Sequence, residues 1–183
     1  MNNVTFKPEL IVFNSYPFPG ASVFPHGAVP YTSIRDVDPT ATPPEIRLNT
    51  GETLFISATY NDDFAAVIIK HNLKVCQRVD LWALLLEPFL DTSFTQEQKE
   101  QTLRVLENFN VGREEAKKIR KCVATKMYAY NSIHWDWVHL GLADLLEASL
   151  PIKPFIRYRL FNSRFIKLYK YAMSIAERGR ASD

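Results

Sequence analysis

The sequence has few of the features that mark membrane, secreted or metal-binding proteins. Its apolar runs are short, such as residues 83–86, whereas about 20 consecutive apolar residues are needed to span a bilayer. The N-terminus has no basic segment followed by an apolar stretch, so no secretory signal is expected. Two cysteines, Cys76 and Cys122, make neither a disulfide framework nor a metal site. We therefore expect a cytoplasmic protein that has reduced thiols and binds no metal or cofactor.

The common nucleotide-binding and catalytic motifs are also missing from the sequence. It contains no Walker A loop, dinucleotide fingerprint, nucleophile elbow or CxxC pair. The acidic residues between positions 36 and 63 do not have the alternate spacing of an EF-hand loop, so we interpret them as solvated loop residues. These absences lower the expectation of an enzyme that depends on a nucleotide or on calcium.

What the sequence does contain is typical of a globular protein with an uneven charge. Its 183 residues are 46% hydrophobic and 13% aromatic, enough for one core and an appendage. Residues 1–150 hold 14 basic and 18 acidic side chains (net −4), and residues 151–183 hold 8 and 2 (net +6). We expect a single α+β globular domain over 1–150, with a strand and loop part in 1–57 and a helical part in 61–150. A basic C-terminal helical appendage follows in 151–183.

The sequence of the N-terminal third is typical of loops and short β-strands. Eight of the eleven prolines fall in the first 44 residues, and proline disfavours the interior of helices. Residues 9–13 and 28–34 are rich in β-formers. Two alternating segments, 45–48 and 53–57, flank a turn in which Gly51 can take a positive φ, so they predict a β-hairpin. We expect one small antiparallel sheet with this hairpin at its centre.

The period of the apolar residues changes to near 3.6 from residue 61 onward. Helix starts are expected near Asn61, at an Asp80 cap, and at Thr95, where Gln98 completes a capping box. A further helix has Glu114 and Glu115 in its first turn, which suits the helix dipole. The expected fold class is therefore α+β: a small antiparallel sheet with a hairpin, followed by a bundle of about five to six helices.

The segment 129–146 gathers two histidines, an aspartate and two tryptophans. If it is helical, His134 lies in the centre of the apolar face and His139 on another sector, so the two imidazoles do not share a metal. We interpret four aromatic residues of the chain as structural: His134, Trp135, Trp137 and Trp82. Asp136 and His139 are three positions apart and could form an acid–imidazole pair beside Tyr130, which is the catalytic alternative.

The C-terminal tail carries an apolar stripe at helical spacing with basic residues beside it. A helix of this kind docks through its stripe and exposes its charge. The sequence leaves open whether the stripe docks on the protein itself or on a partner. The candidate partner-binding residues are Arg157, Arg159, Arg164, Lys167, Lys170, Tyr158, Phe161 and Phe165.

These features favour a non-enzymatic interaction, assembly or regulatory protein that acts through its helical surface and its basic C-terminal helix. The first partner we expect is another protein. One alternative is a protein whose basic tail binds a nucleic acid. Another is an enzyme that uses Asp136 and His139. As a partner, a membrane surface ranks below a nucleic acid. A homo-oligomer is compatible with the sequence. The basic helix after residue 111 also resembles the second helix of a helix-turn-helix, but its basic residues are spread as on a solvated helix.

Overall fold

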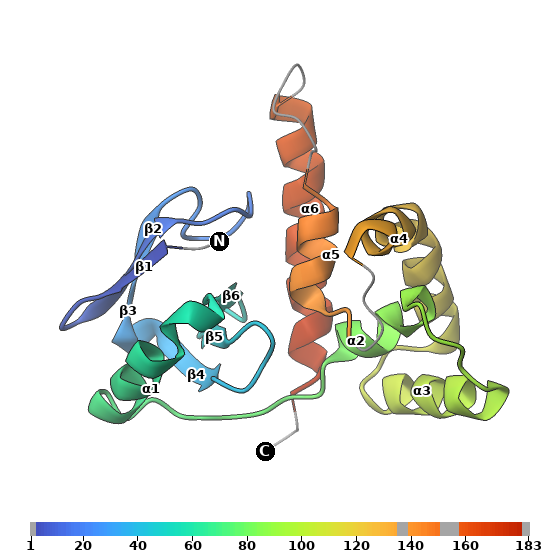
Figure 1. The fold of residues 1–183 in the computed structure, drawn as a ribbon, viewed down its shortest axis with the longest axis horizontal. Helices are drawn as coiled ribbons and strands as arrows, with labels where there is room; N and C mark the ends of the chain where they lie inside the picture. The colour runs from blue at the N-terminus through green and yellow to red at the C-terminus, as the bar shows by residue number, and fades with distance from the viewer. Residues whose placement is uncertain (1–2, 135–138, 151–157, 181–183) are drawn as a thin grey trace. The chain divides into compact units, whose positions relative to one another are not determined.

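A computed structural model describes residues 3–134, 139–150 and 158–180, and it confirms the α+β fold class. Its residues form two compact units (Figure 1). The first contains 1–77 and 151–174, and the second contains 78–150 and 175–183. Helix α6 (Tyr158–Arg178) therefore contributes residues to both units. No described helix is both long enough and apolar enough to cross a membrane.

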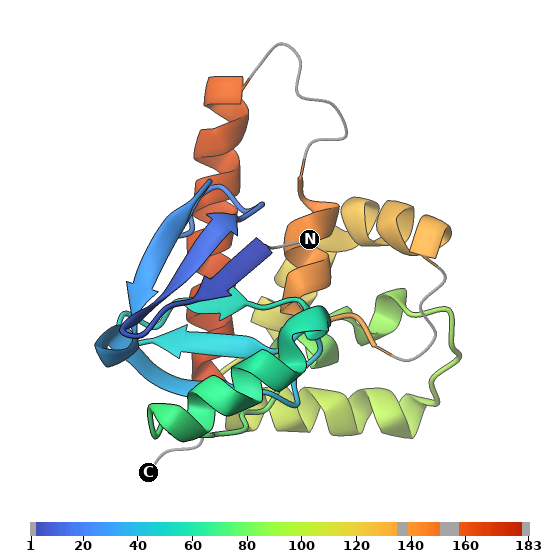
Figure 2. The ribbon, with the colours of Figure 1, turned by 60° about the vertical axis from the view of Figure 1, so that its left-hand side comes forward.

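The first unit contains two antiparallel sheets of three strands each. One has the order β1-β2-β3 and the other β4-β5-β6, and both are visible in Figure 2. The strand bounds are β1 Asn3–Phe6, β2 Leu10–Ser15, β3 Gly27–Pro30, β4 Ile34–Asp38, β5 Glu45–Leu48 and β6 Thr53–Phe55. Short 3-10 turns cover Tyr31–Ser33 and Ala58–Tyr60, and α1 spans Asn61–Lys70.

The hairpin prediction is confirmed, but the prediction of one sheet centred on it is wrong. β5 and β6 pair with Ile46 opposite Leu54, and Gly51 in the turn has a φ of 83°. The expected strand over residues 28–34 divides at Pro30, because proline has no N–H to extend the ladder. A 3-10 turn follows Pro30, and β4 then starts a second sheet at Ile34.

A buried ion pair lies inside the first unit. Arg47 of β5 is 2% exposed and Asp36 of β4 is 4% exposed, and the Nε–Oδ1 distance between them is 2.5 Å. Arg35 contacts the other oxygen of Asp36 at 2.7 Å, and Arg47 also donates to the carbonyl of Cys76. A buried charge needs such partners, since desolvation otherwise disfavours it. The arginine therefore ties the 71–77 segment to the sheet.

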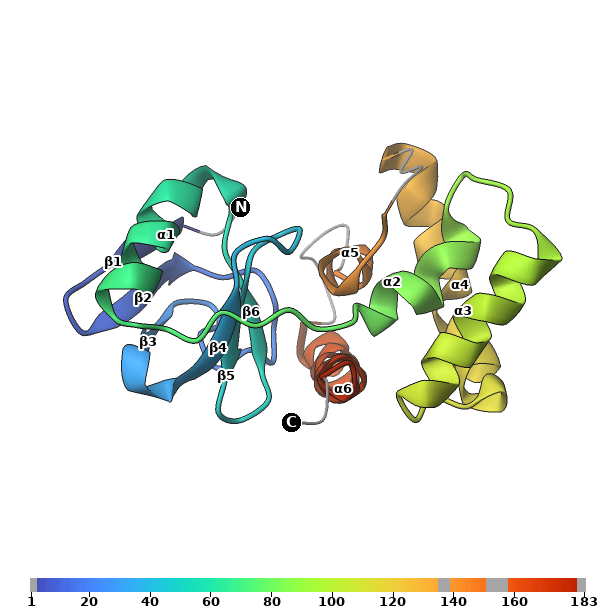
Figure 3. The ribbon, with the colours of Figure 1, turned by 90° about the horizontal axis from the view of Figure 1, so that it is seen from below.

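The second unit is helical, and Figure 3 shows α3 and α4 side by side. The expected Asp80 cap of α2 and the Thr95–Gln98 capping box of α3 are both present. The apolar α2 contributes the buried Trp82, Leu85 and Leu86 to the core. The element bounds are α2 Leu81–Leu86, a 3-10 turn Glu87–Phe89, α3 Gln96–Asn108, α4 Arg113–His134 and α5 Leu142–Ala148.

Candidate functional site

Helix α6 is held in the first unit by one side of its surface. The ring of Phe165 stacks on Phe18 with the centroids 6.5 Å apart. The Tyr169 hydroxyl donates to a carboxylate oxygen of Glu52 at 2.9 Å, and its burial raises the pKa of the phenol. The sulfur of Met173 accepts the Thr53 N–H at 3.4 Å, which covers part of the free edge of β6. These contacts fix the rotation of α6 about its own axis.

The opposite side of α6 is polar and exposed. At about 100° per residue, the exposed residues between positions 163 and 178 fall within a sector of about 120°. Arg164, Lys167 and Lys170 provide three positive charges, and no acidic residue shares the sector. The cations recur every third position, so they extend over about 9 Å of helix. We name this surface the basic face of α6; its members are Ser163, Arg164, Lys167, Lys170, Tyr171 and Ser174.

The three cations of the basic face are not used by the fold. Among the residues that the structure describes, Arg164, Lys167 and Lys170 form no ion pair and no side-chain hydrogen bond. Arg178, two residues before the described C-terminal end, differs because it donates to the carbonyl of Asn110 at 2.8 Å and contacts Glu115 at 3.0 Å. The basic face therefore has charges that are available to a partner.

The predicted partner-binding residues fall partly on this face. Arg164, Lys167 and Lys170 are exposed, whereas Phe165 is buried in the first unit. Tyr158, Arg159 and Phe161 belong to the first turn of α6, but their side chains lie outside the described residues, as does all of Arg157. The sequence did not single out Tyr171, which is 41% exposed on this face. The sequence signal for this position was that Tyr171 is four residues after Lys167, which places both on one side of a helix.

The histidine-rich segment is not one helix, contrary to the prediction. α4 ends at His134, residues 139–141 are not helical, and α5 begins at Leu142. The Gly141 N–H donates to the Asp144 carboxylate at 2.7 Å, which satisfies a free donor at the start of α5. The geometry of two residues three apart on one helix therefore does not apply at His139, and the Asp136–His139 pair stays a prediction. Asp136, Trp135, Trp137 and the His134 side chain lie outside the described part of the chain.

His139 lies beside an acid from a distant part of the chain. Its Nε2 lies 3.2 Å from an oxygen of Asp80, and both side chains are partly exposed. The other Asp80 oxygen accepts the Ala83 N–H at 3.0 Å and caps α2, so the carboxylate has a structural use.

Tyr130, the third member of the catalytic alternative, also has partners of its own. Its hydroxyl lies 3.1 Å from Asp144 and 3.2 Å from Glu147. Burial of the phenol, followed by these two charges, raises the pKa of Tyr130. His139 and Tyr130 therefore contact different carboxylates, and neither contact requires Asp136.

Neither metal geometry nor similarity to other proteins adds a second candidate site. Within the described ranges, no group of three or more His, Cys, Asp or Glu side chains is arranged to hold a metal ion. No protein-family model matches the chain, and no match to it was found among the curated proteins or the solved structures. The chemistry of the surfaces is therefore the guide to function, and the basic face of α6 is the candidate site.

Proposed function

We propose that the protein is an interaction protein that binds an acidic surface of a partner protein through the basic face of α6. The observation that carries the proposal is that Arg164, Lys167 and Lys170 are exposed without ion-pair partners among the described residues. A row of like charges on one rigid helix attracts a surface of opposite charge and fixes its register.

The helix itself favours a protein partner because it is already ordered. Its buried side is packed through Phe165, Tyr169 and Met173, so little conformational entropy is lost when the exposed side binds. Tyr171 adds an aromatic ring beside the cations, and tyrosine and arginine are enriched where proteins meet. The proposed interface therefore combines charge attraction with one aromatic contact.

A nucleic acid is the second candidate, and Tyr171 is the observation that favours it. An exposed ring between cations can stack on a base while the cations neutralise phosphates. Three phosphate contacts give a salt slope of only about −2 to −3 in log K against log salt, which corresponds to weak binding. We therefore rank a nucleic acid below an acidic protein as the partner of the basic face.

The test compares capture from native lysate by three forms of the full chain: the wild type, a basic-face variant and a matched control. The basic-face variant carries Arg164→Glu, Lys167→Glu and Lys170→Glu. The control carries Lys7→Glu, Lys70→Glu and Lys74→Glu, which make the same charge change at exposed lysines of the same unit. Each form is tested before and after nuclease treatment.

If the proposal is right, the wild type and the control capture the same proteins after nuclease treatment, and the basic-face variant does not. The captured proteins should elute as the salt concentration rises toward about 0.3 M. Capture that disappears for the wild type on nuclease treatment would favour the nucleic acid. Equal capture by all three forms would refute a role for the basic face.

A further inference from the structure

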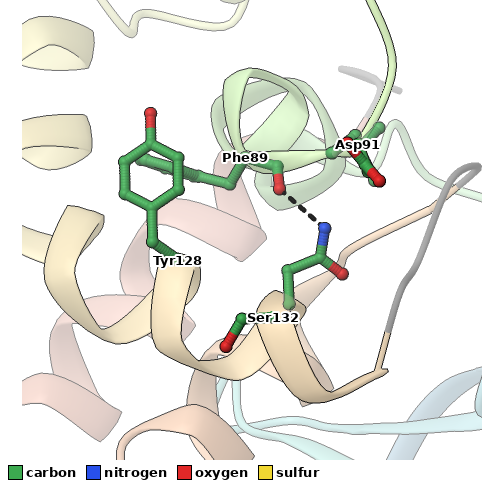
Figure 4. Close-up of a pocket in the computed structure, with 6 residues that line it drawn as sticks. Phe89, Asp91, Tyr128 and Ser132 are labelled. Carbon is green, nitrogen blue, oxygen red and sulfur yellow. Dashed lines mark hydrogen bonds between the residues drawn. The ribbon is translucent and has the colours of Figure 1, made fainter.

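The second unit contains a hollow of about 330 Å³ that the proposed function does not use (Figure 4). One wall is the chain that leaves the 3-10 turn Glu87–Phe89, and the other is the C-terminal half of α4. The volume is at the lower end of the range for small-molecule sites. The lining residues are Phe89, Leu90, Asp91, Tyr128, Asn131 and Ser132.

The floor of the hollow is rigid. Asn131 is buried, and its amide nitrogen donates to the Phe89 carbonyl at 2.9 Å. This bond connects the two walls directly, as the dashed line in Figure 4 shows. The ring of Phe89 is buried and meets the Tyr128 ring edge-on, with the centroids 5.0 Å apart and the planes at 88°. The aromatic part of the site is therefore already in place before a ligand arrives.

The rim of the hollow has two exposed groups. Tyr128 is 60% exposed, which is high for a tyrosine whose ring packs against a buried phenylalanine. Asp91 is exposed and, within the described part of the chain, its carboxylate forms neither an ion pair nor a hydrogen bond. Figure 4 shows Tyr128 and Asp91 on opposite sides of the Phe89 carbonyl. An aromatic ring and a carboxylate thus border the same small apolar space.

From this arrangement we infer that the hollow binds a small organic cation, an amine or guanidinium carried on an apolar body. The apolar body would lie against Phe89, Leu90 and Tyr128. The cation would be attracted by the Asp91 carboxylate and by the electron-rich face of an aromatic ring. An anion of the same shape is disfavoured, because the Asp91 carboxylate on the rim repels it.

The test follows the amide resonances of the 15N-labelled full chain during titration with three probes of similar shape. The probes are phenethylamine, the neutral 2-phenylethanol and the anionic 3-phenylpropionate. Phenethylamine should give saturable shifts at Asp91 and Ser132. The alcohol should bind about threefold or more weakly, as expected when an exposed charge pair and a cation–π contact are lost, and the anion should bind weakest.

Two variants with matched controls identify the groups. Asp91→Asn should reduce the affinity for the amine to that for the alcohol, whereas Glu97→Gln, an exposed acid on α3 outside the hollow, should leave it unchanged. Tyr128→Leu should weaken amine binding, and Tyr128→Phe should retain it. Equal binding of amine and alcohol by the wild type, shifts that do not saturate, or an amine preference that survives Asp91→Asn would each overturn the inference.

Discussion

The two long helices, α4 and α6, both carry many basic residues but use them differently. In α4, Arg113 pairs with two glutamates of α3 at 2.9 Å, and Arg120 donates to two carbonyls at the end of α2 at 3.1 Å. Three of the other exposed lysines of α4, Lys117, Lys118 and Lys121, share their side of the helix with Glu114. In the described part of α6, Arg164, Lys167 and Lys170 have neither an internal use nor an acid on their side of the helix. A high content of basic residues alone therefore does not identify an interface. What distinguishes α6 is that the fold does not use the cations of its basic face.

The largest expected effect comes from removing α6. Truncation after Leu150 removes Phe165, Tyr169, Met173 and Ile175, which are all buried. Each buried side chain of this size contributes about 1.5–3 kcal/mol, and the total is comparable to the whole stability of a domain, about 5–15 kcal/mol. We expect the truncated chain to lose cooperative unfolding in a circular-dichroism melt. A sharp transition near that of the full chain would instead support residues 1–150 as an independent domain.

The next effect concerns a cation that the fold does use. Replacement of Arg47 by Ala removes the buried partner of Asp36 Oδ1 and leaves Arg35 on the other oxygen. The free energy of unfolding should therefore fall by about 3 kcal/mol, the lower end of the range for a broken buried ion pair. Lys167→Ala removes an exposed cation of the basic face and should change it by less than about 0.5 kcal/mol. Urea titrations of both variants measure the difference. Similar losses in the two variants would remove the distinction between used and unused cations.

A smaller effect is expected within α4. Arg120→Ala removes two hydrogen bonds from a charged donor to the Leu84 and Leu85 carbonyls, which should cost about 1.5–3 kcal/mol. Its neighbour Lys121 is exposed, and Lys121→Ala serves as the control. The thermal midpoints of the two variants give the comparison. An Arg120→Ala midpoint equal to that of the control would show that the carbonyl contacts do not stabilise α2.

The buried side of α6 also predicts how stability depends on alkaline pH. Burial raises the pKa of Tyr16 and of Tyr169 above the ordinary tyrosine value of 10.0. Above pH 10 the unfolded chain loses protons that the folded chain retains, so stability should fall as the pH rises, by about 1.4 kcal/mol per unit for each buried phenol. Below pH 10 these groups should contribute no slope.

The control for this prediction is Tyr169→Phe, which should reduce the slope above pH 10, because one of the phenols whose pKa is raised by burial is gone. Urea unfolding at a series of pH values between 8 and the alkaline limit of reversible folding provides the measurement. A slope that is unchanged in the variant would show that the Tyr169 hydroxyl titrates in the same way in the folded and unfolded chains.

Much of the local structure followed from short sequence signals. The turn at Gly51, the Asp80 cap and the Thr95–Gln98 capping box each depend on residues within four positions of one another, and all three are present. The sheet was harder, because Pro30 ends β3 inside a segment of β-forming residues. The segment 129–146 was misread as one helix, although Gly141 followed three residues later by Asp144 was a visible signal for a new helix start.

The candidate site was predictable only in part. Helical periodicity separated Phe165 from Arg164, Lys167 and Lys170, and the structure places these residues on the buried and exposed sides in the same way. The partners of the buried side were not predictable, since Tyr169 meets Glu52 across 117 positions. For the same reason Asp80, 59 positions away, could not be foreseen as the partner of His139.

The most direct test of the difference between the two sides of α6 is the urea unfolding free energy of the full chain with Arg164→Glu, Lys167→Glu and Lys170→Glu. If the fold does not use these cations, the triple variant should unfold within about 1 kcal/mol of the wild type, since exposed substitutions away from structural contacts have small effects. A loss of about 3 kcal/mol or more, the size expected when a buried ion pair is broken, would contradict the account and show that the basic face stabilises the protein itself.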